Sequence, residues 1–187
     1  MIKDTAGFEY RPDKRGIAPQ TFNYDFYIEA VKEFHQAFGH PVRAFPTLPD
    51  EETTNRRMSL IAEEAIELGE AMRTGKIEEI AKEAFDLLYV IFGTLLELGI
   101  HPHSFYIMQA LQASNMSKTT TLSSALLEAT HYEEKTGDAC DVKPTGRENN
   151  YYIVRLRDGK IIKPRSYTPA EEMIKAVLST DSTKFKK

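Results

Sequence analysis

The sequence has 187 residues, of which 41% are hydrophobic and 28% charged, and this composition suits one soluble globular domain with a decorated end. Its formal net charge of -4 argues against binding of nucleic-acid polymers, which requires a basic surface. Cys140 is the only cysteine, which excludes an internal disulfide and a cysteine-rich zinc site. The N-terminus lacks the apolar run of a signal peptide, and the longest apolar run, residues 87–96, is about half of a membrane span. We therefore expect a cytoplasmic protein without membrane contact.

The first part of the chain predicts an arm, a helix and an extended connection. Residues 1–22 lack hydrophobic periodicity and are predicted to form an N-terminal arm. Between Asn23 and Gly39, apolar residues recur at three- and four-residue steps, which predicts an amphipathic helix. We interpret His35 as a partly exposed residue of this helix. Residues 40–52 contain three prolines, which cannot continue a helix and predict an extended connection.

Two helices follow, separated by a turn at Gly75. The first is predicted to begin after the capping residues 53–55 and to end near Thr74, and the second to span about residues 77–98. The short turn implies that the two helices run antiparallel. On the first helix the acidic residues occupy a sector of about 120° opposite the apolar ones, and they are Glu63, Glu64, Glu67 and Glu70. This pattern alone fits a solvated surface as well as a binding site.

The second helix changes that balance because its apolar residues point in every direction, which is typical of a helix buried on all sides. Glu83 and Asp86 nevertheless lie one turn apart in its middle. Buried ionised carboxylates are costly unless they are paired or bound to metal, and Lys82 cannot neutralise five of them. An all-oxygen ligand set selects a hard cation, Mg²⁺ first and Mn²⁺ as a substitute. We therefore predict a metal site formed by Glu63, Glu64, Glu67, Glu83 and Asp86.

A third core helix is predicted after a His-Pro-His turn. His101 and His103 flank the proline and are interpreted as surface histidines. Ser104 is predicted to cap the helix, which ends near residues 114–118. Its predicted core positions are Phe105, Met108, Ala110 and Leu111.

The last third of the chain is predicted to be a mixed extension of the core. Residues 119–150 are interpreted as an insertion with one extra helix, about residues 122–132, followed by loop. Residues 151–156 and 160–163 flank an Asp-Gly turn and predict a β-hairpin. A short helix from Thr168 to about Leu178 and a basic tail then complete the segment 151–187.

The acidic motifs carry a resemblance to a known superfamily. Glu63-Glu64-x-x-Glu67, followed after fifteen residues by Glu83-x-x-Asp86, resembles the signature of the all-α nucleoside triphosphate pyrophosphohydrolases. That superfamily includes MazG, dimeric dUTPases and phosphoribosyl-ATP pyrophosphohydrolase. Further similarities cover residues 33–39, 114–118 and 158–164, and together the resemblance spans about residues 25–118 and 157–178.

The resemblance implies a fold and an activity. The implied fold is all-α, with a four-helix-bundle-type catalytic core over residues 23–118. Homo-oligomerisation, as a homodimer or a dimer of dimers, is implied to complete this core. The implied activity is Mg²⁺-dependent cleavage of a (deoxy)nucleoside triphosphate to the monophosphate and pyrophosphate.

By position, the resemblance also implies roles for single residues. Four carboxylates match the superfamily's metal ligands, and these are Glu64, Glu67, Glu83 and Asp86. Glu63 matches a glutamate that binds a second ion or activates the attacking water, and we favour the catalytic role. Asn115 and Lys118 match a polar pair that binds substrate.

Several alternatives stay open. Hydrolysis restricted to dUTP, or hydrolysis of a phosphoribosyl nucleotide, would use the same carboxylates. A non-catalytic helical module that senses nucleotides or binds another protein would instead leave the acidic face solvated. Four basic side chains can also reach phosphates, although we favour a solvated role for each: Arg56, Arg57, Lys160 and Lys163.

Overall fold

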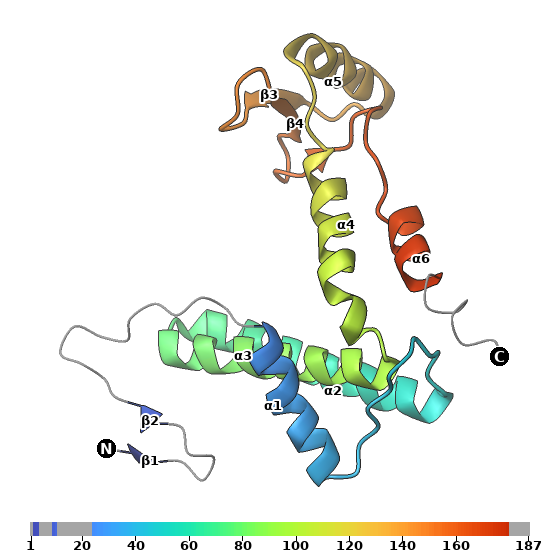
Figure 1. The fold of residues 1–187 in the computed structure, drawn as a ribbon. Helices are drawn as coiled ribbons and strands as arrows, with labels where there is room; N and C mark the ends of the chain where they lie inside the picture. The colour runs from blue at the N-terminus through green and yellow to red at the C-terminus, as the bar shows by residue number, and fades with distance from the viewer. Residues whose placement is uncertain (1, 4–8, 11–23, 180–187) are drawn as a thin grey trace. The chain divides into compact units, whose positions relative to one another are not determined.

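The structure, a computed structural model, describes residues 2–3, 9–10 and 24–179 (Figure 1). The predicted N-terminal arm lies outside these residues except for two short antiparallel strands, β1 (Ile2–Lys3) and β2 (Glu9–Tyr10). Most of the predicted basic tail also lies outside them. The chain forms two compact units, residues 1–41 with 57–93 and residues 42–56 with 94–187, which are described one at a time.

The described residues are mainly helical, as predicted. The helices are α1 (Tyr24–Ala37), α2 (Glu51–Thr74), α3 (Ile77–Leu98), α4 (Ser104–Met116), α5 (Leu122–Thr136) and α6 (Glu171–Ser179). One three-stranded antiparallel sheet accompanies them, formed by β3 (Cys140–Pro144), β4 (Tyr151–Arg155) and β5 (Ile161–Ile162). The fold is therefore mainly α-helical with a small sheet, and the predicted β-hairpin is extended to three strands by β3.

In the first unit, α2 and α3 form the predicted helical hairpin. Only Gly75 and Lys76 connect the two helices, and Gly75 adopts a φ of 72°, which a residue with a side chain rarely adopts. The start of α2, which belongs to the second unit, differs from the prediction, since the helix begins at Glu51 and not after residues 53–55. The carboxylate of Asp50 caps it by accepting a hydrogen bond of 2.7 Å from the Thr53 amide.

Aromatic contacts hold α1 against α3. Tyr27 stacks on Phe92 with ring centroids 6.0 Å apart, and Tyr24 meets the same ring edge-on at 5.9 Å. Further along, Phe34 meets Tyr89 edge-on at 5.8 Å. Such pairs are worth about 0.5–1.5 kcal/mol each beyond the area they bury. These contacts fix α1 across the hairpin that carries the acidic residues.

The same unit buries a histidine and an arginine that were expected to be exposed. His35 is only 2% exposed, and its Nε2 lies 3.3 Å from Nη2 of Arg57, which is also buried. Arginine only donates, so Nε2 accepts and Nδ1 donates to the Pro41 carbonyl at 3.1 Å. Gly93 makes room for this pair, because a Cβ there would lie 2.7 Å from His35 Nε2. The predicted partly exposed His35 and solvated Arg57 are therefore wrong.

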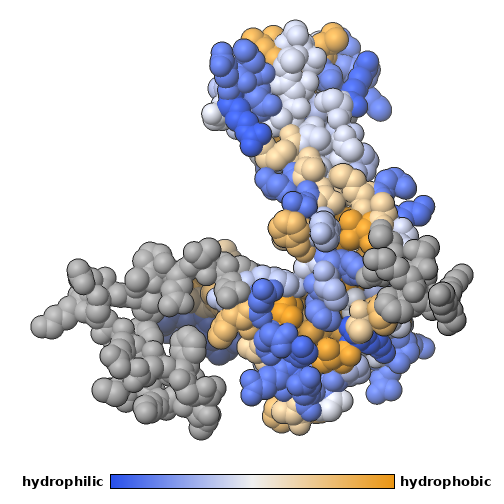
Figure 2. Space-filling view, in the orientation of Figure 1, coloured by the Kyte–Doolittle hydropathy of each residue, from blue (hydrophilic) through white to orange (hydrophobic). Residues whose placement is uncertain are grey.

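The expectation that α3 is buried on every side also fails for the single chain. Ile77 is 74% exposed, and Phe85, Leu88 and Tyr89 are exposed as well. Apolar side chains are visible on the surface of both units (Figure 2). Within its own unit α3 has α1 and α2 as helical neighbours, and two helices do not cover its whole circumference.

In the second unit, the connection before α2 attaches to the last turn of α3. The amides of Arg43 and Thr47 donate to the carbonyls of Leu96 and Leu98, each at 2.9 Å. This satisfies carbonyls that a helix end would otherwise leave without partners. Gly99 ends the helix, and a Cβ there would lie 2.1 Å from the Phe45 carbonyl oxygen. The close approach of the connection therefore requires glycine at this position.

A buried ion pair reinforces this attachment. The side chain of Glu97 is 0% exposed and pairs with both terminal nitrogens of Arg56, at 2.9 and 3.1 Å. Arg56 was expected to be solvated, and its bidentate bond to Glu97 corrects that expectation. A buried carboxylate of this kind is retained only with such a partner.

The turn before α4 and the faces of α4 differ from the prediction. Residues 101–103 form a 3₁₀ turn in which His103 is buried, so it is not a surface histidine. The α4 helix begins at Ser104 without a side-chain cap. Phe105 is 67% exposed, and the expected core residues Met108 and Leu111 are also exposed, whereas Ala110 is buried as predicted.

The chain beyond α4 forms a small module with its own core. Thr121 caps α5 by accepting from the Ser124 amide. The strands follow the order β3-β4-β5, and Ile153 of β4 lies opposite both Val142 and Ile162. Ala125 and Ala129 of α5 pack on Ile153, so the helix covers one face of the sheet. The loop predicted after residue 132 is wrong, because α5 continues to Thr136 and β3 follows it.

The C-terminal helix packs against α4 and begins at Glu171 instead of Thr168. Ser114 donates to the hydroxyl of Tyr167 at 3.0 Å, and the Thr168 amide donates to Ser117 at 2.9 Å. Lys163 lies over the Tyr167 ring, 4.4 Å from its centroid, so this lysine has a cation-π contact and not a purely solvated role.

Among the residues that the structure describes, no single helix is long and apolar enough to cross a membrane. A bent pair made of α3 and residues 101–116 meets the same criteria of length and composition.

Candidate metal centre

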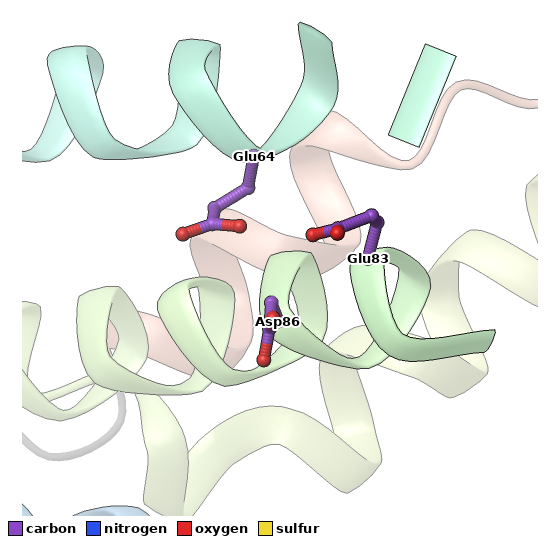
Figure 3. A group of neighbouring side chains, drawn as sticks. All are labelled: Glu64, Glu83 and Asp86. Carbon is purple, nitrogen blue, oxygen red and sulfur yellow. The ribbon is translucent and has the colours of Figure 1, made fainter. Parts of the chain in front are cut away.

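Three of the predicted ligands meet between the helices of the first unit. Glu64 projects from α2 toward α3, which carries Glu83 and Asp86 (Figure 3). Residues three apart on a helix lie on one face, so Glu83 and Asp86 both reach the side that Glu64 approaches. One carboxylate oxygen from each residue lies within 4.8 Å of the other two, and all three residues are half-buried.

Glu67 joins this group through Glu83. The charge of Glu83 raises the pKa of Glu67, and burial and a hydrogen bond between the two carboxyl groups raise it further. The pKa of Glu64 is also raised, first by burial and then by the negative charges of Glu67, Asp86, Glu63 and Glu83. Like charges held this close disfavour ionisation of one another. The carboxylates of the cluster therefore repel one another, and a bound cation would relieve this repulsion.

Glu63 lies beside the cluster, on the exposed surface of α2. Its charge acts on both Glu64 and Glu67, but it is not one of the three residues whose oxygens converge. Its assignment as a ligand or as the catalytic base stays a prediction.

Lys82 places an ammonium group on two of the carboxylates. Its Nζ lies 2.8 Å from Oδ2 of Asp86 and 3.0 Å from both oxygens of Glu83. The hydrogen bonds to Asp86 and then to Glu83 raise the pKa of Lys82, so it stays charged. Lys82 therefore already places one positive charge on the carboxylate oxygens of Glu83 and Asp86.

The donor set fits a hard divalent cation. Three oxygens from separate carboxylates already lie close enough to share one ion, and Glu67 adds a fourth carboxylate next to them. Mg²⁺ and Mn²⁺ prefer such oxygen ligands, and Mg²⁺ usually keeps positions open for water and phosphate oxygens. Histidine or cysteine ligands are not part of the converging group.

The predicted substrate pair belongs to the second unit. Asn115 lies in the last turn of α4 and Lys118 just beyond its end, where Lys118 Nζ donates to Asn115 Oδ1 at 2.8 Å. The two side chains therefore lie together, as their spacing of one turn predicts. Their role toward a substrate stays a prediction.

Sequence reasoning missed two pairs of polar side chains that contain buried groups. His35 with Arg57, and Glu97 with Arg56, were not recognised as pairs. One signal was available for the first pair, since a glycine inside an apolar helix, such as Gly93, often marks a close approach of other groups. For Glu97 the position near the C-terminal end of an apolar helix gave no local indication of its partner.

Comparison with known proteins adds independent information on this region. Residues 31–115 match the family model of phosphoribosyl-ATP pyrophosphohydrolase. The family described by this model is a member of the all-α MazG-like nucleoside triphosphate pyrophosphohydrolase superfamily. The matched segment contains all five predicted carboxylates and Asn115, whereas Lys118 and the module built on α5 lie beyond it.

A viral protein is similar to part of the same chain. "Uncharacterized protein L479" of Acanthamoeba polyphaga mimivirus is 35% identical over 79 residues, which are 39% of this chain. The similarity covers 31% of that relative, so most of the relative's length has no counterpart in the match.

Proposed function

We propose that the protein is a Mg²⁺-dependent pyrophosphohydrolase that cleaves a (deoxy)nucleoside triphosphate to the monophosphate and pyrophosphate. The observation that carries this proposal is the convergence of Glu64, Glu83 and Asp86 within the segment that matches the phosphoribosyl-ATP pyrophosphohydrolase model. Three carboxylates that meet on facing helices suit one hard cation, and phosphates are the ligands that such a cation commonly shares.

In this proposal the carboxylates divide into ligands and a base. Glu64, Glu67, Glu83 and Asp86 hold the metal. A bound Mg²⁺ supplies positive charge that stabilises the negative charge developing on phosphate oxygens. Glu63 accepts the proton of the attacking water, since its exposed place beside the ligands leaves it accessible to solvent.

The substrate and the assembly complete the proposal. Asn115 and Lys118 bind phosphate oxygens or the sugar through an amide and an ammonium group that already lie together. A second copy of the chain covers the exposed apolar side chains of α3, such as Ile77 and Phe85, in a homodimer or a dimer of dimers. We place this activity in the cytoplasm.

A phosphoribosyl nucleotide is the second candidate substrate. The matched family model is that of phosphoribosyl-ATP pyrophosphohydrolase, which supports a nucleotide-like substrate. The same carboxylates would serve hydrolysis of this substrate, and they would also serve a dUTP-restricted enzyme.

A nucleotide panel tests the proposal. The protein is incubated with Mg²⁺ and each of dUTP, dCTP, dGTP, dTTP, dATP, the ribonucleotides and phosphoribosyl-ATP, and pyrophosphate release is measured. We expect release from at least one nucleotide, dependent on Mg²⁺ and lost on chelation. Selective release from dUTP or from phosphoribosyl-ATP would assign the narrower activity.

If no nucleotide released pyrophosphate, the result would favour a different class of protein. A non-catalytic helical module predicts no pyrophosphate from any nucleotide and no rise of the melting temperature with Mg²⁺. That pair of results would reject the proposed hydrolase.

A further inference from the structure

Lys82 occupies a position that the proposed catalytic roles do not use. It immediately precedes Glu83 on α3 and stands one turn before Asp86. Its ammonium group contacts both oxygens of Glu83 and one oxygen of Asp86, at 2.8–3.0 Å. These two carboxylates are also two of the three that converge with Glu64.

We infer that the Lys82 ammonium group is a built-in counter-ion that competes with the divalent metal for the carboxylates of Glu83 and Asp86. The inference rests on the proposed function, in which these carboxylates are ligands. Without metal, Lys82 offsets part of the repulsion between the acidic groups. When metal binds, Lys82 leaves the carboxylate oxygens.

The contacts explain why lysine and metal exclude each other. Lys82 already engages both oxygens of Glu83, and a metal bound to Glu83 would have to share at least one of them. An ammonium group at hydrogen-bond distance from a ligand oxygen would lie close to the dication bound by that oxygen. The two positive charges would repel each other, because repulsion grows as the separation falls.

The surroundings of Lys82 also allow it to leave. Its side chain is 63% exposed, whereas that of Glu83 is 15% exposed. The ammonium group can therefore move into water on its flexible stem while the carboxylate stays in place. The exchange costs only the exposed ion pairs of Lys82, each of which is weak.

A lysine next to the start of the same helix offers a matched control residue. Lys76, immediately before α3, is 61% exposed and pairs with Glu79 at 2.7 Å, outside the converging group. Replacing either lysine removes one positive charge from a similar environment. Only the replacement of Lys82 removes a cation from the proposed ligands.

Titration calorimetry with Mg²⁺ and Mn²⁺, at fixed pH and ionic strength, tests the inference on the full chain. We expect Lys82→Met and Lys82→Gln to bind metal roughly three- to tenfold more tightly than the unmodified protein, since weak ion pairs no longer have to be broken. Lys82→Arg and Lys76→Met should bind with unchanged affinity. Circular dichroism confirms that each variant is folded.

Thermal unfolding gives a second readout. Without metal, Lys82→Met should melt at a lower temperature than Lys76→Met, because the acidic groups lose their counter-ion. The rise in melting temperature on addition of Mg²⁺ should be larger for Lys82→Met.

The outcomes separate the two proposals. Equal metal affinity in the Lys82 variants and the unmodified protein, or equal tightening in Lys82→Met and Lys76→Met, would overturn the inference about Lys82 and leave the proposed function intact. Weaker binding by Lys82→Met would overturn it as well. Absence of metal binding in every protein would instead reject the metal-dependent function itself.

Discussion

The two units of the chain treat acidic side chains differently. In the second unit two carboxylates, those of Glu97 and Asp158, have guanidinium partners. Glu97 pairs with Arg56, and Asp158 pairs with Arg155, whose Nε donates to Asp158 at 2.9 Å. The hydrogen bonds from Arg155 hold the pKa of Asp158 at about 2. In both cases an arginine within the fold balances the carboxylate.

In the first unit the acids of α2 and α3 face one another instead. Lys82 pairs with Glu83 in this cluster, and the pKa values of Glu64 and Glu67 are raised. The comparison shows that the chain has the means to balance carboxylates with arginine and does not use them here. An acidic excess of this kind is stable when a cation from outside completes it.

The largest expected effect concerns activity. Asp86→Asn or Glu64→Gln removes a charged oxygen ligand, and we expect turnover of the preferred nucleotide to fall about a hundredfold or more. Without metal, the same variants should be at least as stable as the unmodified protein, because repulsion within the cluster decreases. Glu78→Gln, an exposed change in the first turn of α3, serves as the control. Full turnover in the two site variants would contradict the assignment.

Removing one partner of the Arg56–Glu97 ion pair should instead lower the stability of the fold. Arg56→Met leaves the fully buried Glu97 without its bidentate partner, and we expect the free energy of unfolding to fall by about 3 kcal/mol. Urea denaturation measures this change. The double variant Arg56→Met with Glu97→Met should recover much of the loss, since the buried negative charge is removed as well. A loss of much less than 1 kcal/mol in the single variant would show that Glu97 does not depend on Arg56.

A smaller loss is expected at Arg155. This residue also donates to the Tyr132 hydroxyl at 3.1 Å, so Arg155→Met removes contacts to α5 as well as to Asp158. We expect the melting temperature to fall by about 2–5 °C. Mg²⁺ should not reverse the fall, which distinguishes this region from the carboxylate cluster. Arg147→Met, at an exposed position, is the control, and an equal fall there would contradict the role of Arg155.

The smallest effect is a pH dependence of opposite sign in the two units. Raised pKa values of Glu64 and Glu67 mean that the folded, metal-free chain binds more protons than the unfolded chain, so stability falls as pH rises from about 4.5 through the raised values. For Asp158 the folded pKa of about 2 lies below its ordinary 3.8. Its contribution is fully present above the ordinary value and is lost as pH falls toward 2.

Unfolding curves across this pH range check both signs. Glu64→Gln should weaken the fall in stability as pH rises, and Asp158→Asn should weaken the loss in acid. If both variants showed the pH profile of the unmodified protein, the two groups would not be the origin of the dependence.

Local sequence signals were sufficient for the hairpin and its acidic face. The helix α3 begins after Gly75 and ends before Gly99, as predicted. Helix ends are set by local signals, such as a glycine that adopts a positive φ. The spacing of Glu83 and Asp86 placed both on one face, and the short turn brought Glu64 opposite them.

Features that depend on distant partners were not predictable in the same way. His35 and Arg57 are separated by 22 residues, and nothing in either helix indicates that one will accept a hydrogen bond from the other. The residues of β3 have too short an apolar pattern to predict a strand, and they form one by pairing with β4. Exposed Phe105 shows the reverse error, since an apolar helical position need not be covered within one chain.

The space above Gly93 has a consequence for sequence variation. A side chain at position 93 would meet the His35 and Arg57 side chains, since a Cβ there would lie 2.7 Å from His35 Nε2. Substitutions at these three positions are therefore expected to depend on one another. A lineage that replaces the buried histidine or arginine with a smaller residue gains room for alanine at position 93. Among relatives of this chain, we therefore expect glycine at this position to be inherited together with the histidine-arginine pair, and a larger residue to accompany its loss.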